Sequence, residues 1–401
     1  MARYIRFWLN MFKESFSGSK TYYLWVGVLT ALLLPGIYSY YLQLSQGLVV
    51  TNMVDQVSWG AYIANFTFLV GVAAAAVLLV VPAYIYHRDD VKEIVLLGEI
   101  LAFCAMLMCL LFIAVDLGRP DRFWHIIPFI GRLNFPQSIL AWDVIVLNGY
   151  LLLNMHIPGY LLYKLYRGEQ PTRRYYMPFV IISIFWAVSI HTVTAFLYSG
   201  LGGRPFWNTS LMAPRFLISA FAAGPALLII IFYLINRFHP YFRVKESVSK
   251  LLITIASVTM PINLFLLGSE VFKEFYTNSS HVASAQYLFL GLHGHSTLVP
   301  YIWTAIAFNI ISTIIFVTPV LRSKTSWLLG GCLLSILGIW TEKGMGLIIP
   351  GFIPSPLGDV VEYTPSIHEF FICLAIWAFG ALSYTVISKV AISIVSGRLK
   401  E

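Results

Sequence analysis

Repeated long apolar runs constrain the fold of this 401-residue chain more than any other feature of its sequence. About 20 apolar residues in a helix cross the hydrocarbon core of a bilayer, where only helices and closed barrels satisfy their own backbone hydrogen bonds. Only 11% of the residues are Asp, Glu, Lys or Arg, against roughly 25% in a soluble protein. The pattern predicts an all-α polytopic membrane protein with about ten transmembrane helices. The runs lie at about 22–45, 58–86, 93–117, 138–164, 175–199, 214–236, 250–272, 299–321, 326–343 and 366–392.

Two further segments complete this organisation. Residues 1–20 alternate basic with aromatic and aliphatic side chains, which predicts an amphipathic segment on the inner membrane face. Residues 21–401 are then a single integral membrane domain. The stretch 282–298 is too interrupted for a crossing and is expected to be a short interfacial or re-entrant piece.

The distribution of basic residues predicts the orientation. With a cytoplasmic N-terminus, ten crossings place most of the 26 Lys and Arg residues in inner segments, as the positive-inside rule requires. A missed or extra crossing would exchange inner and outer segments from that point of the chain onwards, and the basic residues would no longer concentrate on one side. We therefore predict that both termini are cytoplasmic, and the net charge of +8 needs no nucleic-acid partner.

The cysteines argue against a redox centre bound by this chain. Iron–sulfur clusters need closely spaced thiolates and c-type haem needs a CxxCH motif, and the sequence contains neither. The four cysteines lie singly in apolar runs, where they act as small apolar side chains. They are Cys104, Cys109, Cys332 and Cys373.

The histidines do not predict a haem or a metal site either. His156 and His191 differ in expected depth by about 15 Å, so they cannot ligate one haem. His293 and His295 are two residues apart without carboxylate support, which is a weak metal signal. We expect no haem, iron–sulfur cluster, flavin or metal in this chain.

Ionisable residues gather near the outer ends of the predicted helices. A charged group at bilayer depth costs roughly 2.5–3.5 kcal/mol, so it usually has a partner or a function. A quinone headgroup needs hydrogen-bond donors and a nearby proton acceptor at the edge of an apolar slot. Asp143 and His191 would accept protons, with loop arginines as donors or charge partners. The alternative is that these carboxylates simply reach water or pair with the arginines. The outer set is Asp116, Asp143, Glu270, Glu342 and His191, with Arg119, Arg204 and Arg215.

Two ionisable residues lie nearer the inner side. Glu99 and His156 would contribute to a proton path through the bundle. Helix–helix hydrogen bonds explain the neighbouring Asn and Thr residues equally well. The outer loops are rich in Trp, Phe, Pro and Gly, which fits either a docking surface for another protein or an ordinary aromatic belt.

Several long motifs resemble one known family. They are WGAYIANFTFLVGVAAAA at 59–76, DLGRPDRFWHI at 116–126, HTVTAFLYSGLGGRPFWNTSLMAPRFLISAFAAGPAL at 191–227, NLFLLGSEVFKEFY at 263–276 and GIWTEKGMGLIIPGFIPSPLGDVVEYTP at 338–365. Together they resemble the polysulfide-reductase membrane-subunit family (NrfD type), in its ten-helix branch. The last motif most resembles the DsrP subunit of the Dsr complex of sulfate-reducing prokaryotes.

The resemblance implies a fold of two four-helix bundles, crossings 2–5 (about 58–199) and 6–9 (about 214–343), flanked by the first and last helices. It implies electron exchange between menaquinone and a ferredoxin-like iron–sulfur subunit on the outer face of a prokaryotic cytoplasmic membrane. Further cytochrome and iron–sulfur subunits would complete the complex.

The resemblance also assigns residues to a quinone site in the first bundle. The matching positions are Asp116, Asp143 and His191, with Trp59 and Tyr62 as walls. Glu270 and Glu342 belong to the second bundle, where a proton route is the better expectation.

Two other functions fit the residues alone. An ion-coupled secondary transporter would use buried carboxylates, but such groups usually lie near the membrane midplane, whereas these lie at one face. A cofactor-free membrane anchor for redox subunits would need no site.

Overall fold

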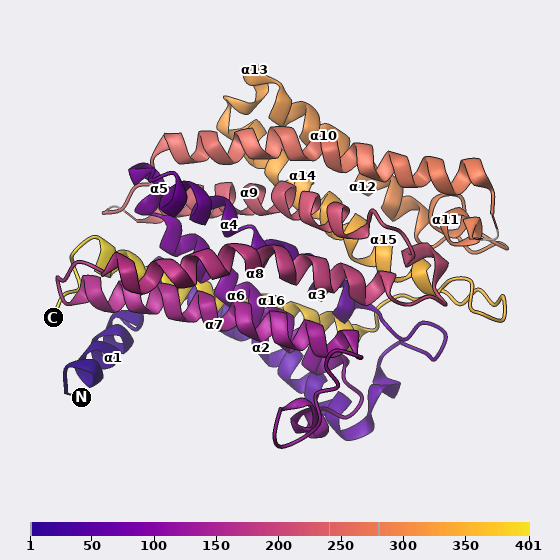
Figure 1. Cartoon of the computed structure of the whole chain (residues 1–401), viewed down its shortest axis with the longest axis horizontal. Coiled ribbons are helices and arrows are strands. Elements are labelled where there is room, and N and C mark those ends of the chain that lie inside the picture. The colour runs from indigo at the N-terminus through magenta and orange to yellow at the C-terminus, as the bar shows by residue number, and fades with distance from the viewer. Residues whose placement is uncertain (1, 240, 280) are drawn as a thin grey trace.

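The computed structural model describes residues 2–239, 241–279 and 281–401, and this part of the chain is helical (Figure 1). Ten of its helical spans are long and apolar enough to cross a membrane, which confirms the predicted class. The main helices are α1 (Ala2–Ser15), α2 (Lys20–Gln46), α3 (Ala61–Ala74), α6 (Val95–Asp116), α7 (Ile139–Tyr166), α8 (Arg173–Ser199), α9 (Met212–Phe238), α10 (Glu246–Thr277), α11 (Val282–Phe289), α12 (Val299–Val317), α14 (Thr325–Lys343) and α16 (Ile367–Val395). The short elements are η1 (Leu48–Val50), α4 (Val77–Val80), η2 (Val81–Ile85), α5 (Asp89–Lys92), η3 (Pro120–Ile126), η4 (Pro205–Trp207), α13 (Pro319–Arg322), α15 (Met345–Ile348) and η5 (Pro350–Phe352).

The long helices form two four-helix bundles, as expected. Helices α3, α6, α7 and α8 pack together as the first bundle, and α9, α10, α12 and α14 as the second. Helices α2 and α16 pack on each other, and α16 also packs on α6. Only 11% of the most apolar window of α2 is buried, so this helix lies on the periphery, where its side chains face lipid or another protein.

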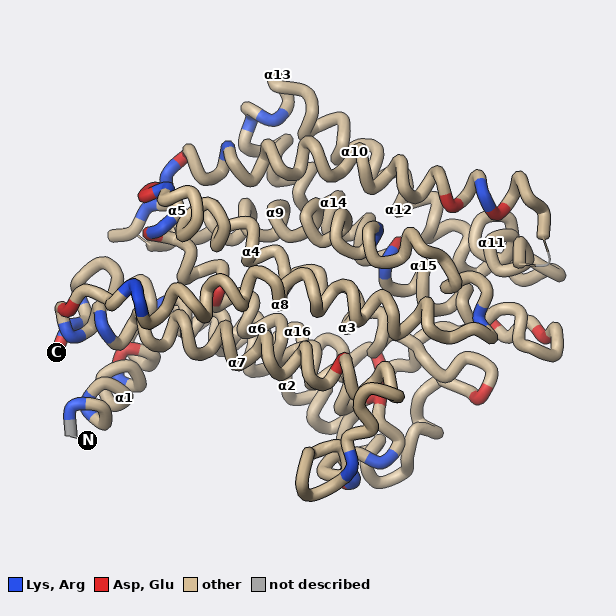
Figure 2. Tube along the Cα trace, viewed as in Figure 1, with Lys and Arg blue, Asp and Glu red and all other residues tan. Residues whose placement is uncertain are grey.

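Both termini lie at one end of the bundles (Figure 1). Lys and Arg residues gather at that same end (Figure 2), which we call the inner end, and we call the opposite one the outer end. The cytoplasmic location of the inner end stays a prediction from the positive-inside rule. Helix α1 packs here through Phe7, whose ring centroid lies 5.1 Å from those of Tyr163 and Tyr166.

The second crossing is interrupted, which the apolar pattern does not predict. Helix α3 ends at Ala74, α4 follows after two residues, and η2 is a π-helical turn that contains Pro82. Proline lacks a backbone N–H and widens the local hydrogen-bond pattern, and burial among neighbouring helices makes such a break tolerable in a membrane.

The two bundles approach each other closely at this break. A Cβ atom built on Gly224 of α9 would lie 1.9 Å from the Cβ of Ala75. The run of small residues at 71–76 is typical of a packing face, and Ala73, Ala74 and Ala75 are fully buried. Small residues here let two helices pack at short distance, as is common in membrane proteins.

Some boundaries differ from the expected ones. Helix α12 ends at Val317 instead of continuing to 321, because a residue before proline disfavours helical geometry and Thr318 precedes Pro319. The ninth apolar span continues past α14 through α15 and η5 to Phe352. The segment 282–298 contains the eight-residue helix α11, which is too short to cross a bilayer.

Candidate functional site

Asp143 lies buried between α7 and α8 in the outer half of the first bundle. Its side chain is 1% exposed, and the hydroxyl of Thr194 donates a hydrogen bond to its Oδ1 over 3.0 Å. Thr194 shares a face of α8 with His191 and Tyr198, three and four residues away along the helix. The hydroxyl of Tyr198 is 2.5 Å from that of Thr67 on α3. A polar strip therefore runs along this face of α8, and Asp143 adjoins it.

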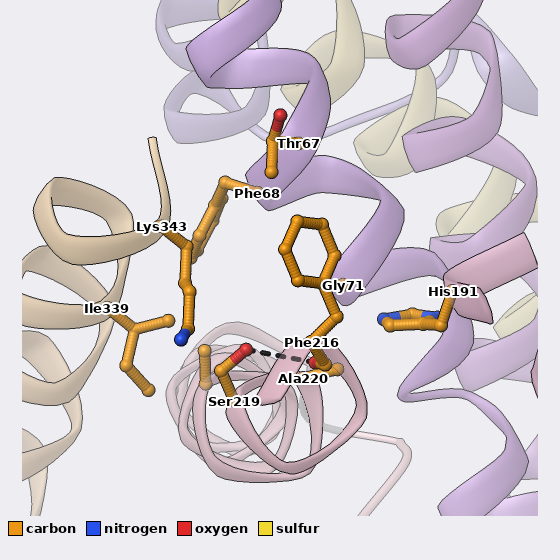
Figure 3. Close-up of a pocket in the computed structure, with 10 residues that line it drawn as sticks. Thr67, Phe68, Gly71, His191, Phe216, Ser219, Ala220, Ile339 and Lys343 are labelled. Carbon is orange, nitrogen blue, oxygen red and sulfur yellow. Dashed lines mark hydrogen bonds between the residues drawn. The ribbon is translucent and has the colours of Figure 1, made fainter. Parts of the chain in front are cut away.

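His191 points into a buried cavity. The residue is 1% exposed, and neither of its ring nitrogens has a hydrogen-bond partner. The cavity measures about 10 Å³, which is about the space of one water molecule. Figure 3 shows His191 on one side of the cavity and Lys343 on the other, with Gly71 and Phe216 between them. A buried imidazole gains stability from a polar neighbour, so this cavity suits a water molecule or a polar atom of a ligand.

Asp116 belongs to a second polar group at the outer end of α6. The Tyr62 hydroxyl donates to Gln43 Oε1 over 2.7 Å, and Gln43 Nε2 donates to the carbonyl of Val115 over 2.6 Å. Asp116 is the next residue, and its Oδ1 is buried without a hydrogen-bond partner. The structure thus places Tyr62 and Asp116 close to one glutamine from α2.

Trp59 is part of an aromatic cluster that covers the outer end of the first bundle. Its ring centroid lies 5.7 Å from those of Trp207 and Phe352 and 5.9 Å from that of Tyr198. The Arg204 guanidinium lies 4.7 Å from the centroid of the Phe352 ring and donates to the Phe352 carbonyl over 3.2 Å. We call Trp59, Tyr198, Trp207 and Phe352 the aromatic cluster. Because Tyr198 also belongs to the polar strip, the cluster and the strip are continuous.

Arg119 lies apart from these groups. Its guanidinium pairs with Asp121 over 2.9 Å in the outer loop, and both side chains are more than half exposed. It is available to a ligand or a partner at the surface but does not line the buried strip.

Glu270 and Glu342, the two predicted site carboxylates of the second bundle, bind one arginine. Arg215 Nη2 lies 3.0 Å from Glu342 Oε1, and Nη1 pairs with Glu270. Lys343 Nζ is also 3.0 Å from Glu342 Oε1, and both side chains are buried. Asn263 and Asn309 donate to the other oxygen of Glu342 over 3.1 and 2.9 Å. We call Arg215, Glu270, Glu342 and Lys343 the ionic cluster.

The inner-side candidates do not contact each other. Glu99 is 1% exposed and both of its carboxyl oxygens are buried without a partner, as is the hydroxyl of Tyr84 in the π-helical turn. His156 is only partly buried, and its Nε2 lies 3.3 Å from the Tyr175 hydroxyl on the neighbouring helix. Glu99 is thus a group of the bundle interior, and His156 belongs to the α7–α8 surface.

A metal site finds no support in the described residues. Within residues 2–239, 241–279 and 281–401, no three or more His, Cys, Asp or Glu side chains group closely enough to hold a metal ion. His295 Nδ1 lies 3.3 Å from Glu362 in an outer loop. The backbone N–H of Thr297 donates to Glu362 over 2.8 Å. Burial raises the pKa of Glu362, but the contacts with Thr297 and His295 outweigh it and keep this pKa below its usual range.

A family model described as polysulphide reductase, NrfD, matches residues 49–354, which is most of the chain. The chain belongs to the polysulphide reductase NrfD family. This confirms the resemblance that the motifs indicated at the level of the family.

Three relatives of this NrfD-family chain illustrate its similarities. It is 25% identical to the Hdr-like menaquinol oxidoreductase integral membrane subunit of Archaeoglobus fulgidus over 391 residues, 94% of each chain. It is 21% identical to the menaquinone reductase integral membrane subunit of Nitratidesulfovibrio vulgaris, over 86% of each chain. It is also 25% identical to one subunit of the selenate reductase of Mesobacillus selenatarsenatis, over 64% of this chain and 66% of that one.

Sequence reasoning missed two buried ionisable residues, Glu369 and Lys343. Glu369, at the start of α16, is fully buried and accepts hydrogen bonds from the Tyr363 hydroxyl and from the backbone of Asn52 and Ser366. The sequence Ser-x-x-Glu at 366–369 is a capping-box signature that would have revealed it. The predicted orientation places Lys343 with the outer loops, but its side chain is only 4% exposed, and its position beside Glu342 was the available signal.

Proposed function

We propose that this NrfD-family chain is the quinone-reactive integral membrane subunit of a respiratory redox complex. It exchanges electrons between menaquinone or menaquinol and an iron–sulfur subunit of ferredoxin type on the outer face, with further cytochrome and iron–sulfur subunits in the complex. The observation that carries the proposal is the buried pair of proton-accepting side chains, Asp143 and His191, beside the aromatic cluster at the outer end of the first bundle. Two relatives, a menaquinol oxidoreductase subunit and a menaquinone reductase subunit, support it by their names.

The side chains of this region fit the chemistry of a quinone headgroup. Oxidation of a quinol releases two electrons and two protons, and Asp143 and His191 each accept one proton from a hydroxyl in contact with them. The hydroxyl of Thr194 orients Asp143, and the aromatic cluster supplies an apolar wall. Reduction of a quinone uses the same groups as proton donors. The electrons pass to the iron–sulfur partner.

We also propose a membrane location, a type of complex and a set of proton-conducting residues. The chain lies in a prokaryotic cytoplasmic membrane with both termini cytoplasmic, and it acts as a DsrP-type subunit in sulfate reduction. Glu99 and His156 on the inner side, and Glu270 and Glu342 on the outer side, are the proposed proton-conducting residues.

Quenching of a fluorescent quinone analogue by the purified complex tests the proposal. We expect saturable quenching by the wild-type complex. Asp143→Asn and His191→Ala should each lose about 5- to 150-fold in affinity, since each removes a hydrogen-bonding group worth about 1–3 kcal/mol when buried. Asp121→Asn, an exposed carboxylate at the same end, is the matched control and should bind as the wild type does.

The other two functions predict different results. A membrane anchor would copurify with redox subunits but show no saturable quenching. A transporter would isolate without redox subunits and take up solute in exchange for an ion gradient. Either outcome would refute the quinone proposal.

A further inference from the structure

The cavity that His191 lines is shared by both bundles. His191 enters it from α8 of the first bundle, and Lys343 enters it from the last turn of α14 in the second (Figure 3). Thr67 and Ser219 add two hydroxyls to its wall, and the remaining lining is apolar. One water molecule fits the cavity and would lie between the imidazole and the ammonium group.

On its other side Lys343 joins the ionic cluster. Its Nζ is 3.0 Å from Glu342 Oε1, the same oxygen that accepts from Arg215 Nη2 over 3.0 Å. Arg215 also pairs with Glu270, so the cluster holds two cations and two carboxylates. Moving a proton from Lys343 to Glu342 leaves the net charge of the cluster unchanged, so no extra charge is buried in this step.

A second cavity lies beyond the cluster. It measures about 30 Å³ and is lined by Arg215, Glu270, Glu274 and Glu342 among apolar side chains, so it has space for about two water molecules. At its far side Glu274 pairs with Lys273 over 2.9 Å, and the Lys273 side chain is 53% exposed. Three carboxylates thus lead from the buried cluster to the surface at the outer end.

We propose that protons released by quinol oxidation leave the first bundle through Lys343 and reach the outer surface through the second bundle. This inference rests on the proposed function. The two cavities and the ionic cluster between them form one polar route from His191 to Glu274.

Each step moves one proton and no electrons. The imidazole of His191 passes the proton it has taken from quinol to the water in the first cavity. Lys343 breaks one N–H bond as Glu342 forms an O–H bond, and then takes a replacement proton from that water. Glu342 releases its proton to water in the second cavity, and Glu270 and Glu274 relay it outwards.

A lysine at position 343 suits proton transfer better than an arginine would. The groups facing it or its partner carboxylate are His191 from α8, Arg215 from α9, Glu270 from α10 and Glu342 from α14. A buried lysine gives up its proton readily, whereas an arginine stays protonated in proteins. Arg215 therefore holds the two carboxylates in place, and Lys343 carries the proton.

The test uses the complex in liposomes that contain a pH-sensitive dye, with quinol-analogue oxidation and proton release measured together. Lys343→Met should reduce turnover on the order of 100-fold, as expected for loss of a proton-transfer group, while the affinity for a quinone analogue stays within about twofold of wild type because Lys343 has no role in binding. Lys343→Arg keeps the charge but cannot release a proton, so it should be equally slow. Lys324→Met, an exposed lysine at the other end of the same helix, is the control and should behave as wild type.

Three results would overturn the route. Wild-type turnover and pH dependence in Lys343→Met would show that protons bypass this residue. Full activity in Lys343→Arg would show that only its charge is needed. If Lys343→Met fails to assemble, Glu274→Gln tests the outer half of the route, and wild-type turnover there would refute it. A wild-type complex that neither binds the analogue nor oxidises quinol would instead refute the proposed function itself.

Discussion

The contact between Gly224 and Ala75 gives a quantitative test of how the two bundles pack. We consider Gly224→Ala, which adds one methyl group where the helices are closest. The new Cβ would lie 1.9 Å from the Cβ of Ala75, against an ordinary carbon–carbon contact of about 3.5–4.0 Å. The helices would have to separate by roughly 1.5–2 Å at this point, or neighbouring side chains would have to shift.

The expected cost follows from two opposing terms. Overpacking a tight core by one carbon costs about 1–3 kcal/mol, and replacing glycine by alanine in a helix returns about 1 kcal/mol. We therefore expect Gly224→Ala to lower the free energy of unfolding by up to about 2 kcal/mol. The double variant Gly224→Ala with Ala75→Gly moves the methyl group across the contact and should restore most of the stability.

Thermal unfolding of the four proteins in detergent, followed by tryptophan fluorescence, completes a double-mutant cycle. The cycle separates the clash from the helix propensities because the propensity terms cancel in the coupling energy. We expect a coupling of about 1–3 kcal/mol. A coupling energy near zero, or a double variant no more stable than the single ones, would refute the reasoning.

Three further predictions concern other parts of the molecule. Arg215→Met leaves two carboxylates with one lysine and should destabilise the protein by about 3–5 kcal/mol, with much of the loss in melting temperature recovered in Arg215→Met combined with Glu270→Gln. The hydrogen bond from Arg88 lowers the pKa of Asp90 to about 2, from 3.8 in the unfolded chain. The ionised Asp90 therefore stabilises the fold fully above pH 3.8, and this contribution is lost as the pH falls towards 2. Asp90→Asn should remove this part of the pH dependence of the free energy of unfolding. Gly351→Val should displace the aromatic cluster, since a Cβ at that position would lie 1.9 Å from the indole ring of Trp207. The variant should change tryptophan emission and weaken binding of a quinone analogue. Unchanged emission and affinity would contradict the contact.

Much of the fold was predictable because the bilayer imposes strong rules on a sequence. The count of ten crossings and the short segment around α11 follow from the length of apolar runs. The two bundles and the flanking position of the first helix follow from the family resemblance. The π-helical break near Pro82 was missed because an apolar run gives no sign of where neighbouring helices allow the backbone to deviate.

The sequence predicted how far along its helix each site residue lies, but not which face of the helix it occupies. Position along a helix places Asp143, His191 and Glu342 at the outer end, since each residue advances the helix by about 1.5 Å. The sequence gives little sign of which face of its helix each residue occupies, because α7, α8 and α14, which carry them, have no marked polar face. The hydrogen bonds of Gln43 and the place of Lys343 in the cavity of His191 depend on how the helices pack, so the sequence does not predict them.

Photolabelling tests whether menaquinone binds in the first bundle. The complex would be irradiated with a photoreactive menaquinone analogue, and the labelled peptides identified by mass spectrometry, with excess unmodified quinone as competitor. We expect competitor-sensitive labelling within Ala61–Ala74 of α3, Ile139–Tyr166 of α7 or Arg173–Ser199 of α8. This labelling should be lost in Asp143→Asn and in His191→Ala. Competitor-sensitive labelling confined to α10, α12 or another subunit would contradict this expectation.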